Sequence, residues 1–245
     1  MTIGLIGYGR FGRFAAHHLV RHVKVLVHDP AVQRRPAGER GIVFGSLSEA
    51  ASQTVVLLAL PVSEMKAVLR RIREIVRPGS LVVDLCAVKE QPVRWMKEML
   101  PAGVRILGTH PLFGPDSASR TIRGHHIVLC PVRISRQELD AVRKRLLRAG
   151  LVSLVMTARR HDRMMAETIL LTQFMGRVVL RASLRRWPAF TDNYRNLLSL
   201  VDVARHDTRQ LFADMVRFTR HGKVVIRCVG RAVQDELTAL KRGDD

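Results

Sequence analysis

Aromatic residues, cysteines and long apolar runs are all scarce in this chain of 245 residues. Aromatic residues make up only 5%, so the chain lacks the aromatic-rich basic surface on which single-stranded nucleic acid stacks. Cys86, Cys130 and Cys228 have no paired or metal-ligand spacing, so we predict reduced, buried thiols, no metal site and a cytoplasmic protein. No apolar run reaches the roughly 18–20 residues that span a bilayer, so we expect no membrane partner.

Acidic side chains are scarce as well, with 21 against 41 lysines and arginines, which gives a formal net charge of +20. The basic excess is spread along the chain and not gathered into one tail. Three interpretations stay open: arginines on solvated helix faces, steering of a small polyanionic substrate, and binding of nucleic acid. Because aromatics are few, we do not expect a nucleic-acid partner.

Strand-length apolar runs alternate with helical patterns over residues 1–157. The strand-length runs are Ile3–Ile6, Lys24–Val27, Thr54–Leu60, Leu81–Asp84, Val104–Leu107, Ile127–Cys130 and Val152–Met156. The helical patterns are Phe11–Arg21, Val62–Val76, Gln91–Met99 and Arg136–Ala149. This alternation predicts an α/β domain with a doubly wound, mostly parallel sheet.

Residues 158–245 have a different pattern, which predicts helices throughout. A single doubtful strand falls at Val224–Ile226, and helix breaks are expected at Trp187-Pro188 and His221-Gly222. We therefore predict a domain boundary at residue 157, with a smaller all-helical domain behind it.

The sequence Gly7-Tyr8-Gly9-Arg10-Phe11-Gly12 fits the pattern G-x-G-x-x-G between an apolar strand and a helical pattern. Gly7 permits the tight turn, Gly9 lets a pyrophosphate approach the backbone, and Gly12 lets the helix pack close to the strand. The helix N-terminus presents its positive end to the phosphates, and Arg10 adds a charge there. These features predict a Rossmann-like dinucleotide-binding domain.

Asp29 ends the second expected strand, 22 residues after Gly7. An acidic side chain there accepts hydrogen bonds from the adenine ribose, which favours NAD over NADP. Arg34 and Arg35 keep NADP open. Leu60 ends the expected strand Thr54–Leu60 and Pro61 follows it. The two residues lie either beside the middle of the cofactor or in an ordinary strand-to-helix turn.

His110 follows the apolar run Val104–Leu107. Because Pro111 cannot donate to a sheet ladder, we expect the strand to stop near His110. The carboxyl edge of a parallel sheet is where such folds bind ligands, so His110 is a candidate general base. The alternative is a histidine with a structural hydrogen bond.

Four motifs in this order resemble the prephenate and arogenate dehydrogenases of tyrosine biosynthesis. They are Gly7–Gly12, Asp84–Lys89, Gly108–Ser117 and His161-Asp162. The forms of Gly108–Ser117 and Thr172–Arg177 look closest to the arogenate dehydrogenases of plants. The resemblance covers nearly the whole chain.

The resemblance implies NAD(P)-dependent oxidative decarboxylation of prephenate to 4-hydroxyphenylpyruvate, with His110 taking the hydroxyl proton. Two alternatives share this chemistry: an arogenate dehydrogenase and an enzyme with dual specificity. Ala87 stands where the family usually has a Ser that binds the reacting hydroxyl and the cofactor, and Gln173 stands where many members have His. These departures keep open a catalytically weak, NAD-binding regulatory paralogue.

The family motifs and the spacing of residues on one helix together predict a set of substrate contacts. The set is His110, Pro111, His161, Thr168, Thr172, Gln173 and Arg177. We expect His161 to open the first helix of the second domain. At 100° per residue, His161, Met165, Thr168 and Thr172 fall within about 60° on one face, facing either substrate or a polar seam between helices. Arg177 and Arg205 are candidates for binding the substrate carboxylates, and a solvated surface position is favoured for Arg205.

Two further features concern specificity and assembly. In plant members the loop after the position of Pro188 separates prephenate from arogenate, and here Phe190 and Asp192 stand near that place. Apolar stretches at Val178–Leu180 and Leu197–Val201 predict a homodimer through the helical domain. His18 and His22 have the i, i+4 spacing of a metal pair but no third ligand nearby, so we expect a solvated pair.

Overall fold

The structure, a computed structural model, describes residues 1–32, 39–183, 187 and 191–242. The chain divides into two compact units, Met1–His161 and Asp162–Asp245. The division lies four residues beyond the expected boundary at residue 157, so His161 belongs to the first unit.

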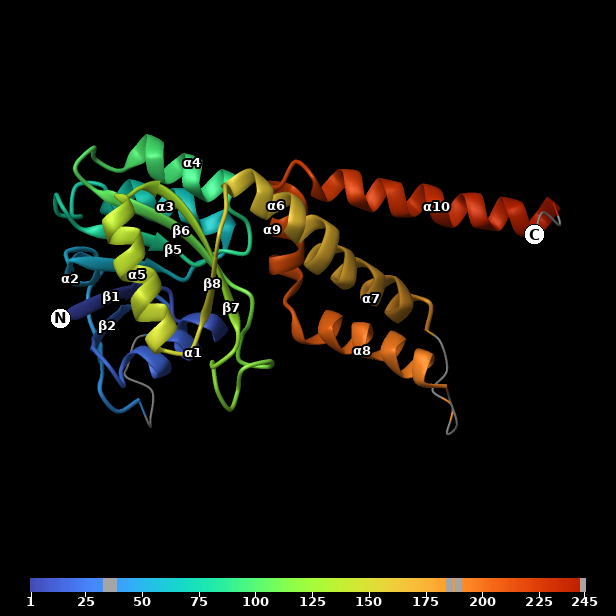
Figure 1. Cartoon of the computed structure of the whole chain (residues 1–245), viewed down its shortest axis with the longest axis horizontal. Helices are drawn as coiled ribbons and strands as arrows, with labels where there is room; N and C mark the ends of the chain where they lie inside the picture. Colours follow the sequence, from blue (N-terminus) through green and yellow to red (C-terminus); the bar gives the residue numbers. More distant parts are fainter. Residues whose placement is uncertain (33–38, 184–186, 188–190, 243–245) are drawn as a thin grey trace. The chain divides into compact units, whose positions relative to one another are not determined.

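One eight-stranded sheet organises the first unit (Figure 1), in the order β3-β2-β1-β4-β5-β6-β7-β8. The strands are β1 (Thr2–Ile6), β2 (Lys24–His28), β3 (Ile42–Phe44), β4 (Val55–Leu58), β5 (Leu81–Asp84), β6 (Arg105–Pro111), β7 (His126–Arg133) and β8 (Val152–Val155). All neighbours are parallel except β6 and β7. The predicted doubly wound, mostly parallel sheet is confirmed.

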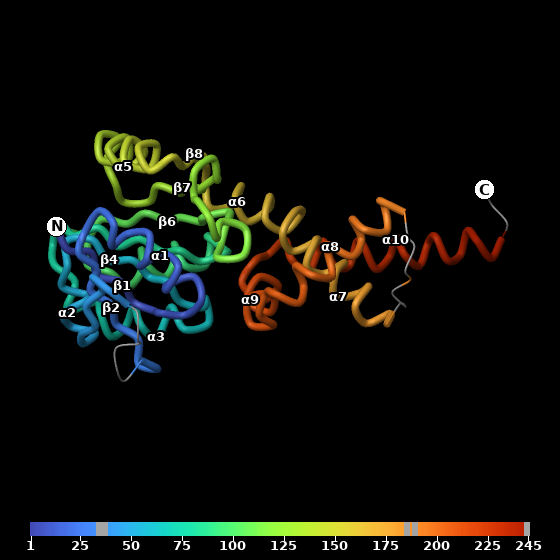
Figure 2. Tube along the Cα trace, turned by 90° about the horizontal axis from the view of Figure 1, so that it is seen from below, coloured from blue at the N-terminus to red at the C-terminus, as the bar shows by residue number. Residues whose placement is uncertain are grey.

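Helices cover both faces of this sheet. They are α1 (Arg10–Leu19), α2 (Leu47–Ala51), α3 (Val62–Ile72), α4 (Glu90–Met99) and α5 (Arg136–Arg148). Helices α1 and α5 lie on one face, where Leu57 packs into the cores beneath both, while α2 and α3 lie on the other (Figure 2). Helices α2 and α5 begin with full capping boxes, Ser46 with Glu49 and Ser135 with Glu138, which satisfy orphan N–H groups at both helix starts.

Strand β6 ends at Pro111, one residue beyond His110, so the expected end near His110 is confirmed, although Pro111 itself belongs to the strand. Its pairing with β5 ends at Gly108, which lies opposite Asp84. Beyond that point β6 pairs only with β7, and Pro111 lies opposite Ile127. A missing donor is tolerated where a strand has only one neighbour, which explains why Pro111 continues the strand.

The second unit is helical wherever the structure describes it. Helix α6 (Ala158–Met165) crosses the division and continues through a π-helical segment, η1 (Ala166–Leu170), into α7 (Leu171–Arg181). The remaining helices are α8 (Asp192–His206), α9 (Arg209–Phe218) and α10 (Gly222–Arg242). Helices α7 and α8 approach closely at Gly176, where a Cβ would lie 2.1 Å from the carbonyl oxygen of Leu200.

Three predictions about this helical part have different outcomes. Val224–Ile226 lies in the first turns of α10, so the expected strand is wrong. The expected break at His221-Gly222 is confirmed, since α9 ends at Phe218 and α10 begins at Gly222. The expected break at Trp187-Pro188 falls at the edge of the described residues, and Pro188 and Phe190 lie outside them.

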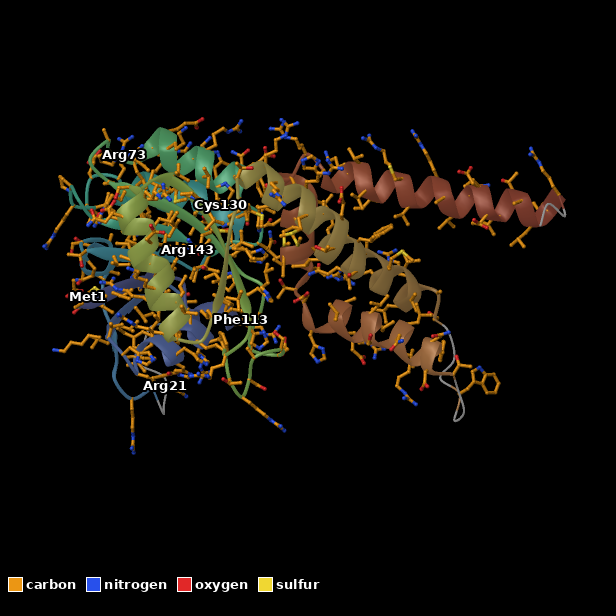
Figure 3. All side chains as sticks on the ribbon, in the orientation of Figure 1. Met1, Arg21, Arg73, Phe113, Cys130 and Arg143 are labelled. Atoms are coloured by element: carbon orange, nitrogen blue, oxygen red, sulfur yellow. The ribbon has the colours of Figure 1, made fainter. Side chains whose placement is uncertain are left out.

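The three cysteines do not share one environment. Cys86 and Cys130 are buried, as predicted, and Cys130 lies on β7 (Figure 3). Cys228 is exposed, because it lies on a solvated face of α10, so its predicted burial is wrong. Among the described residues, no helix is both long and apolar enough to cross a membrane.

Candidate active site

The glycine-rich loop between β1 and α1 has two glycines that cannot be replaced and one that faces open space. Gly7 has φ of +100°, and a Cβ there would lie 2.3 Å from the carbonyl oxygen of Ala59. A Cβ on Gly12 would lie 2.2 Å from the carbonyl oxygen of Gly7, but one on Gly9 would meet no heavy atom within 4 Å. Helix α1 has no side-chain cap and no acidic residue in its first turn. Open space beside Gly9 and a helix N-terminus without a side-chain cap fit the pyrophosphate of a dinucleotide.

Asp29 follows β2 directly and braces this loop. Its carboxylate accepts hydrogen bonds from the backbone N–H of Tyr8 at 2.6 Å and of Ala31 at 2.8 Å. Each carboxylate oxygen has a second lone pair, so these two bonds leave acceptor capacity for ribose hydroxyls. Arg34 and Arg35, which bear on a 2′-phosphate, lie outside the described residues.

Arg10 has a partner that the sequence did not indicate. Its guanidinium forms an ion pair with Asp116 of the Gly108–Ser117 motif, at 2.8 Å, with both side chains about half exposed. This contact connects the fingerprint loop with the loop that follows the histidine. A cofactor phosphate at this loop would compete with Asp116 for Arg10. Phe11 is half-buried and packs on Phe14, with ring centroids 5.8 Å apart.

A buried carboxylate, Glu39, lies next to the fingerprint loop, and no sequence pattern had indicated it. The Glu39 side chain is fully buried, and it pairs with Arg13 at 2.8 Å and with His17, both from α1. Burial alone would raise the pKa of Glu39, but hydrogen bonds from His17 and Tyr8 and the Arg13 charge outweigh it, and the pKa is lowered. Burial raises the pKa of the Tyr8 phenol, and the neighbouring Glu39 carboxylate raises it further. We call Tyr8, Arg13, His17 and Glu39 the Glu39 cluster.

The carboxyl edge of β5 and β6 carries the deepest polar cluster of the first unit. Asp84 ends β5, His110 is the next-to-last residue of β6, and Lys89 and His161 reach the same place from the start of α4 and from α6. His110 is 8% exposed, and the other three are fully buried. We call Asp84, Lys89, His110 and His161 the His110 cluster.

Asp84 and Lys89 form a completely buried ion pair. Asp84 also accepts a hydrogen bond from the backbone N–H of Cys86 at 3.0 Å, and its own carbonyl accepts one from the Thr109 hydroxyl at 2.8 Å. Burial raises the pKa of Asp84, although the Lys89 charge and hydrogen bond oppose it. The pair thus fixes the turn after β5 against β6.

His110 and His161 are hydrogen-bonded to each other. Nδ1 of His110 lies 2.9 Å from Nε2 of His161, and the two rings meet edge to face at 71°. Burial first, then the His161 and Lys89 charges, lower the pKa of His110 well below its ordinary value. Burial and Lys89 lower the pKa of His161 to about 3. Both rings are therefore neutral at physiological pH, the state that a general base requires.

The remaining expected cofactor residues follow the ends of neighbouring strands. Leu60 and Pro61 follow β4, with Leu60 half-buried and Pro61 exposed at the N-cap of α3. Ala87, half-buried, lies in the turn between Asp84 and Lys89. Parallel strands end at one edge, so the structure brings these residues to the edge that carries His110.

The other expected substrate residues belong to the second unit. Gln173 is fully buried and donates to the Asp207 carboxylate at 2.6 Å. Arg177, one turn later, donates to the Asp207 carbonyl at 3.4 Å and lies over the Phe212 ring at 4.8 Å. Arg205 pairs with Asp202 at 3.9 Å, with both side chains about half exposed. The substrate roles of Gln173 and Arg177 stay predictions.

The expected polar stripe on one helix face is wrong. His161 lies in the first turn of α6 but does not open it, since the helix begins at Ala158. The π-helical segment η1 changes the rotation per residue, so the 100° spacing does not hold through it. Thr168 is exposed and donates to the Met164 carbonyl, and Thr172 donates to the Thr168 carbonyl.

The histidine pair at residues 18 and 22 forms no metal site. Helix α1 ends at Leu19, so only His18 lies on it, and the His18 ring bonds to the Phe14 carbonyl at 2.9 Å. Across the described part of the chain, no group of three histidine, cysteine or acidic residues is arranged to hold a metal ion.

A phosphate-cradling glycine loop and a buried neutral histidine at one edge of a parallel sheet define a dinucleotide-binding domain of the oxidoreductase class. Residues 15–155 match the family model "Prephenate dehydrogenase, nucleotide-binding domain", so the chain belongs to the prephenate dehydrogenase family. The matched range includes Asp84, Lys89 and His110.

Two curated relatives come from Arabidopsis thaliana. Chloroplastic arogenate dehydrogenase 2 is 32% identical over 222 residues, which cover 86% of this chain and 62% of that protein. Chloroplastic arogenate dehydrogenase 1 is 28% identical over 222 residues, which cover 86% of this chain and 35% of that protein. The chain therefore spans less than two thirds of the length of either plant relative.

Solved structures share the fold. Prephenate dehydrogenase from A. aeolicus, in complex with hydroxyphenyl propionate and NAD+, aligns over 99% of this chain and 91% of its own, with a TM-score of 0.78 and 16% identity. Synechocystis arogenate dehydrogenase aligns over 100% of this chain and 93% of its own, with a TM-score of 0.67 and 19% identity.

Proposed function

We propose that this chain oxidatively decarboxylates prephenate to 4-hydroxyphenylpyruvate with a nicotinamide cofactor. The observation that carries the proposal is His110, a buried neutral imidazole at the sheet edge that also carries the glycine loop. Arogenate is the second candidate substrate, and an enzyme that accepts both is the third. Both plant relatives are named arogenate dehydrogenases, which supports arogenate as a candidate substrate.

In this proposal the His110 ring removes the proton from the ring hydroxyl of the substrate. The cofactor, when bound, accepts the hydride from the carbon that carries this hydroxyl. The bond to the ring carboxylate then breaks, its electrons complete the aromatic ring as a phenolate, and carbon dioxide leaves. The phenolate takes back the proton that His110 holds, which gives the phenol and restores the neutral ring. Loss of carbon dioxide makes the reaction irreversible. Only the nitrogen of His110 that is not bonded to His161, Nε2, is free to take the proton.

The cofactor would bind along the fingerprint loop. Gly7, Gly9 and Gly12 leave space for the pyrophosphate, and Asp29 would accept the ribose hydroxyls. Asp29 favours NAD, and NADP stays the alternative. Replacing Gly9 with Ala is expected to raise the KM for the cofactor at least tenfold and to leave the melting temperature unchanged, because the added methyl fills open space in the free protein.

Ala87 is the observation that supports a second class of function, a weakly catalytic regulatory paralogue. It supplies no hydroxyl beside the cofactor, and one missing hydrogen bond is worth roughly 1–3 kcal/mol. That corresponds to about a ten- to hundredfold loss in rate, which weakens catalysis without abolishing it. Replacing Ala87 with Ser should therefore raise kcat by about that factor.

The deciding experiment assays the purified full chain with NAD or NADP and with prephenate or arogenate in turn. We expect turnover of at least one substrate and a loss of about 10²–10⁴-fold in kcat for His110→Gln. The exposed His126 on β7 offers a matched control, and His126→Gln should keep full activity. Cofactor binding without turnover of either substrate would establish the regulatory alternative.

We also propose that the chain forms a homodimer through its helical unit. Val178 and Leu180 on α7 are 42% and 37% exposed, whereas Val201, in the other stretch expected at the interface, is buried. A second apolar stripe supports the proposal: Val233, Leu237 and Leu240 on α10 are 51%, 49% and 74% exposed at i, i+4 and i+7 spacing. Sedimentation should give a dimer for the native chain and a lighter species for Leu237→Glu.

A cytoplasmic location is a further proposal, supported by the burial of the reduced thiols of Cys86 and Cys130. The high positive charge supports steering of a dianionic substrate as well as solvation. If steering contributes, kcat/KM should fall as ionic strength rises.

A further inference from the structure

The hydrogen bond between His110 and His161 has a direction that decides whether His110 can act as a base. A neutral imidazole carries one N–H and one lone pair, so in each neutral ring one nitrogen donates and the other accepts. Nδ1 of His110 and Nε2 of His161 are 2.9 Å apart, so one of them carries the shared proton. The position of that proton fixes the tautomer of His110.

We propose that His161 is a positioning residue that accepts the Nδ1–H of His110 at its own Nε2 and thereby keeps the lone pair of His110 on Nε2. The inference rests on the proposed function, because a base for the substrate hydroxyl needs that lone pair. In this proposal His161 acts by orienting His110 and does not contact the substrate itself. The opposite direction would put the proton on Nε2 of His110 and leave no acceptor for the substrate.

The burial of both rings supports this role. His161 is fully buried in the first turn of α6, and His110 is 8% exposed at the end of β6. A buried ring with a polar partner holds one tautomer, whereas an exposed ring exchanges both with water. The edge-to-face arrangement, with centroids 5.1 Å apart, aims one ring nitrogen at the other.

The charges around the pair support it as well. Lys89 faces both imidazoles, and its ammonium disfavours a second positive charge on either ring. Asp84 faces Lys89 and holds it in place. When His110 takes the substrate proton, its Nδ1–H is already directed at the lone pair of His161, and this hydrogen bond stabilises the imidazolium that forms. A histidine thus occupies the position that a carboxylate has in a Ser-His-Asp triad.

The direct test observes the tautomer of His110 in the full-length protein without substrate or cofactor. Nitrogen-15 chemical shifts of labelled histidine rings distinguish a protonated Nδ1 from a protonated Nε2, and His110→Gln identifies the resonances. We expect His110 to be protonated on Nδ1 in the native chain. Protonation on Nε2 would overturn the proposal, whatever the enzyme turns over.

Two replacements of His161 then separate positioning from packing. Gln at position 161 keeps an acceptor oxygen, whereas Phe keeps the ring volume and has no acceptor. We expect His161→Gln to preserve the tautomer and to stay within tenfold of native kcat. We expect His161→Phe to shift His110 toward Nε2–H and to lose about 10²–10⁴-fold in kcat, with substrate KM within threefold of the native value.

Other outcomes contradict the proposal in recognisable ways. Equal losses for His161→Gln and His161→Phe would mean that the residue acts by packing alone. A raised KM with unchanged kcat would mean that His161 contacts substrate. If His161→Phe does not fold, the native spectrum and His161→Gln still decide the direction of the bond. If the native chain turns over neither substrate, the proposed function fails, and the tautomer measurement still stands on its own.

Discussion

Two buried carboxylates in the first unit, Asp84 and Glu39, are paired with cations in different ways. Both side chains are fully buried. The partner of Asp84, Lys89, is fully buried too, whereas Arg13 and His17, the partners of Glu39, are 56% and 45% exposed. The pKa of Asp84 is raised by burial, and the pKa of Glu39 is lowered by its hydrogen bonds.

This contrast between Asp84 and Glu39 shows that a neighbouring cation does not by itself make a buried carboxylate cheap to ionise. The free-energy cost also depends on whether the cation is buried. In the Glu39 cluster the partner side chains Arg13 and His17 stay about half exposed, so only the carboxylate loses its hydration. In the His110 cluster the ammonium and the carboxylate both lose their hydration, and the same ammonium faces the two histidines. The edge where catalysis is proposed is thus the place where the electrostatic cost of folding is highest.

The largest difference in stability between the two clusters is expected when a positively charged side chain is removed from each. Lys89→Met leaves Asp84 charged and buried, which is expected to cost about 3–5 kcal/mol in the free energy of unfolding. Arg13→Met removes a half-exposed partner from Glu39 and should cost less than about 1 kcal/mol. Urea unfolding of both variants measures the difference, and Asp84→Asn combined with Lys89→Met should recover part of the larger loss. Equal losses for the two single variants would contradict the distinction.

The two clusters should also differ in the pH range over which they affect the free energy of unfolding. The folded-state pKa values of His110 and His161 lie below the ordinary value of 6.5. Below pH 6.5 the unfolded chain therefore binds protons at these two rings that the folded chain does not bind. Stability is therefore complete above about pH 6.5 and falls as the pH drops toward 3, by up to about 1.4 kcal/mol per pH unit for each ring.

Asp84 opposes this trend, because its raised pKa favours the folded state as the pH falls. The contribution of His161 is isolated by comparing the native chain with His161→Gln, whose unfolding free energy should vary less steeply between pH 6.5 and 4.5. Glu39 acts in a separate window, since its lowered pKa gives stability that is present above 4.5 and lost as the pH falls through the folded-state value. Parallel pH profiles for the two proteins would show that His161 is not kept neutral by the fold.

A smaller effect than that of Lys89→Met is expected from neutralising Glu39. Glu39→Gln keeps the side-chain volume and retains hydrogen-bonding groups for Arg13 and His17, so the loss in unfolding free energy should be about 1–2 kcal/mol. Because Tyr8 lies in the fingerprint loop, the KM for the cofactor should rise severalfold while kcat stays the same. A fall in kcat with unchanged cofactor KM would mean that the Glu39 cluster is coupled to the reaction step and not to the loop.

Much of the fold could be predicted from residue patterns. The apolar runs gave seven of the eight strands, because buried parallel strands need continuous apolar sequence. The three-residue strand β3 and the five-residue helix α2 were missed, since such short elements have no measurable period. Val224–Ile226 was misassigned, because three consecutive β-branched residues fit a strand and one turn of an amphipathic helix equally well.

The candidate site divides in the same way. His110 and the glycines were found from the sequence, because their function depends on local geometry at a strand end and a helix start. Lys89 and Glu39 were given no role, and His161 was expected to face substrate or a polar seam between helices. Their partners lie 5, 22 or 26, and 51 residues away, and no periodicity indicates such pairings.

The glycine loop, the parallel sheet and a histidine at its carboxyl edge follow from residue types alone, because each depends on residues within one turn or one strand. The set of groups that share the low-dielectric interior at that edge depends on how the chain folds. The tertiary structure places His161 on His110 and Lys89 beside both, and their burial keeps the imidazoles neutral. Electrostatics in a protein depends on distance and burial, and neither is encoded in the spacing of residues along the chain.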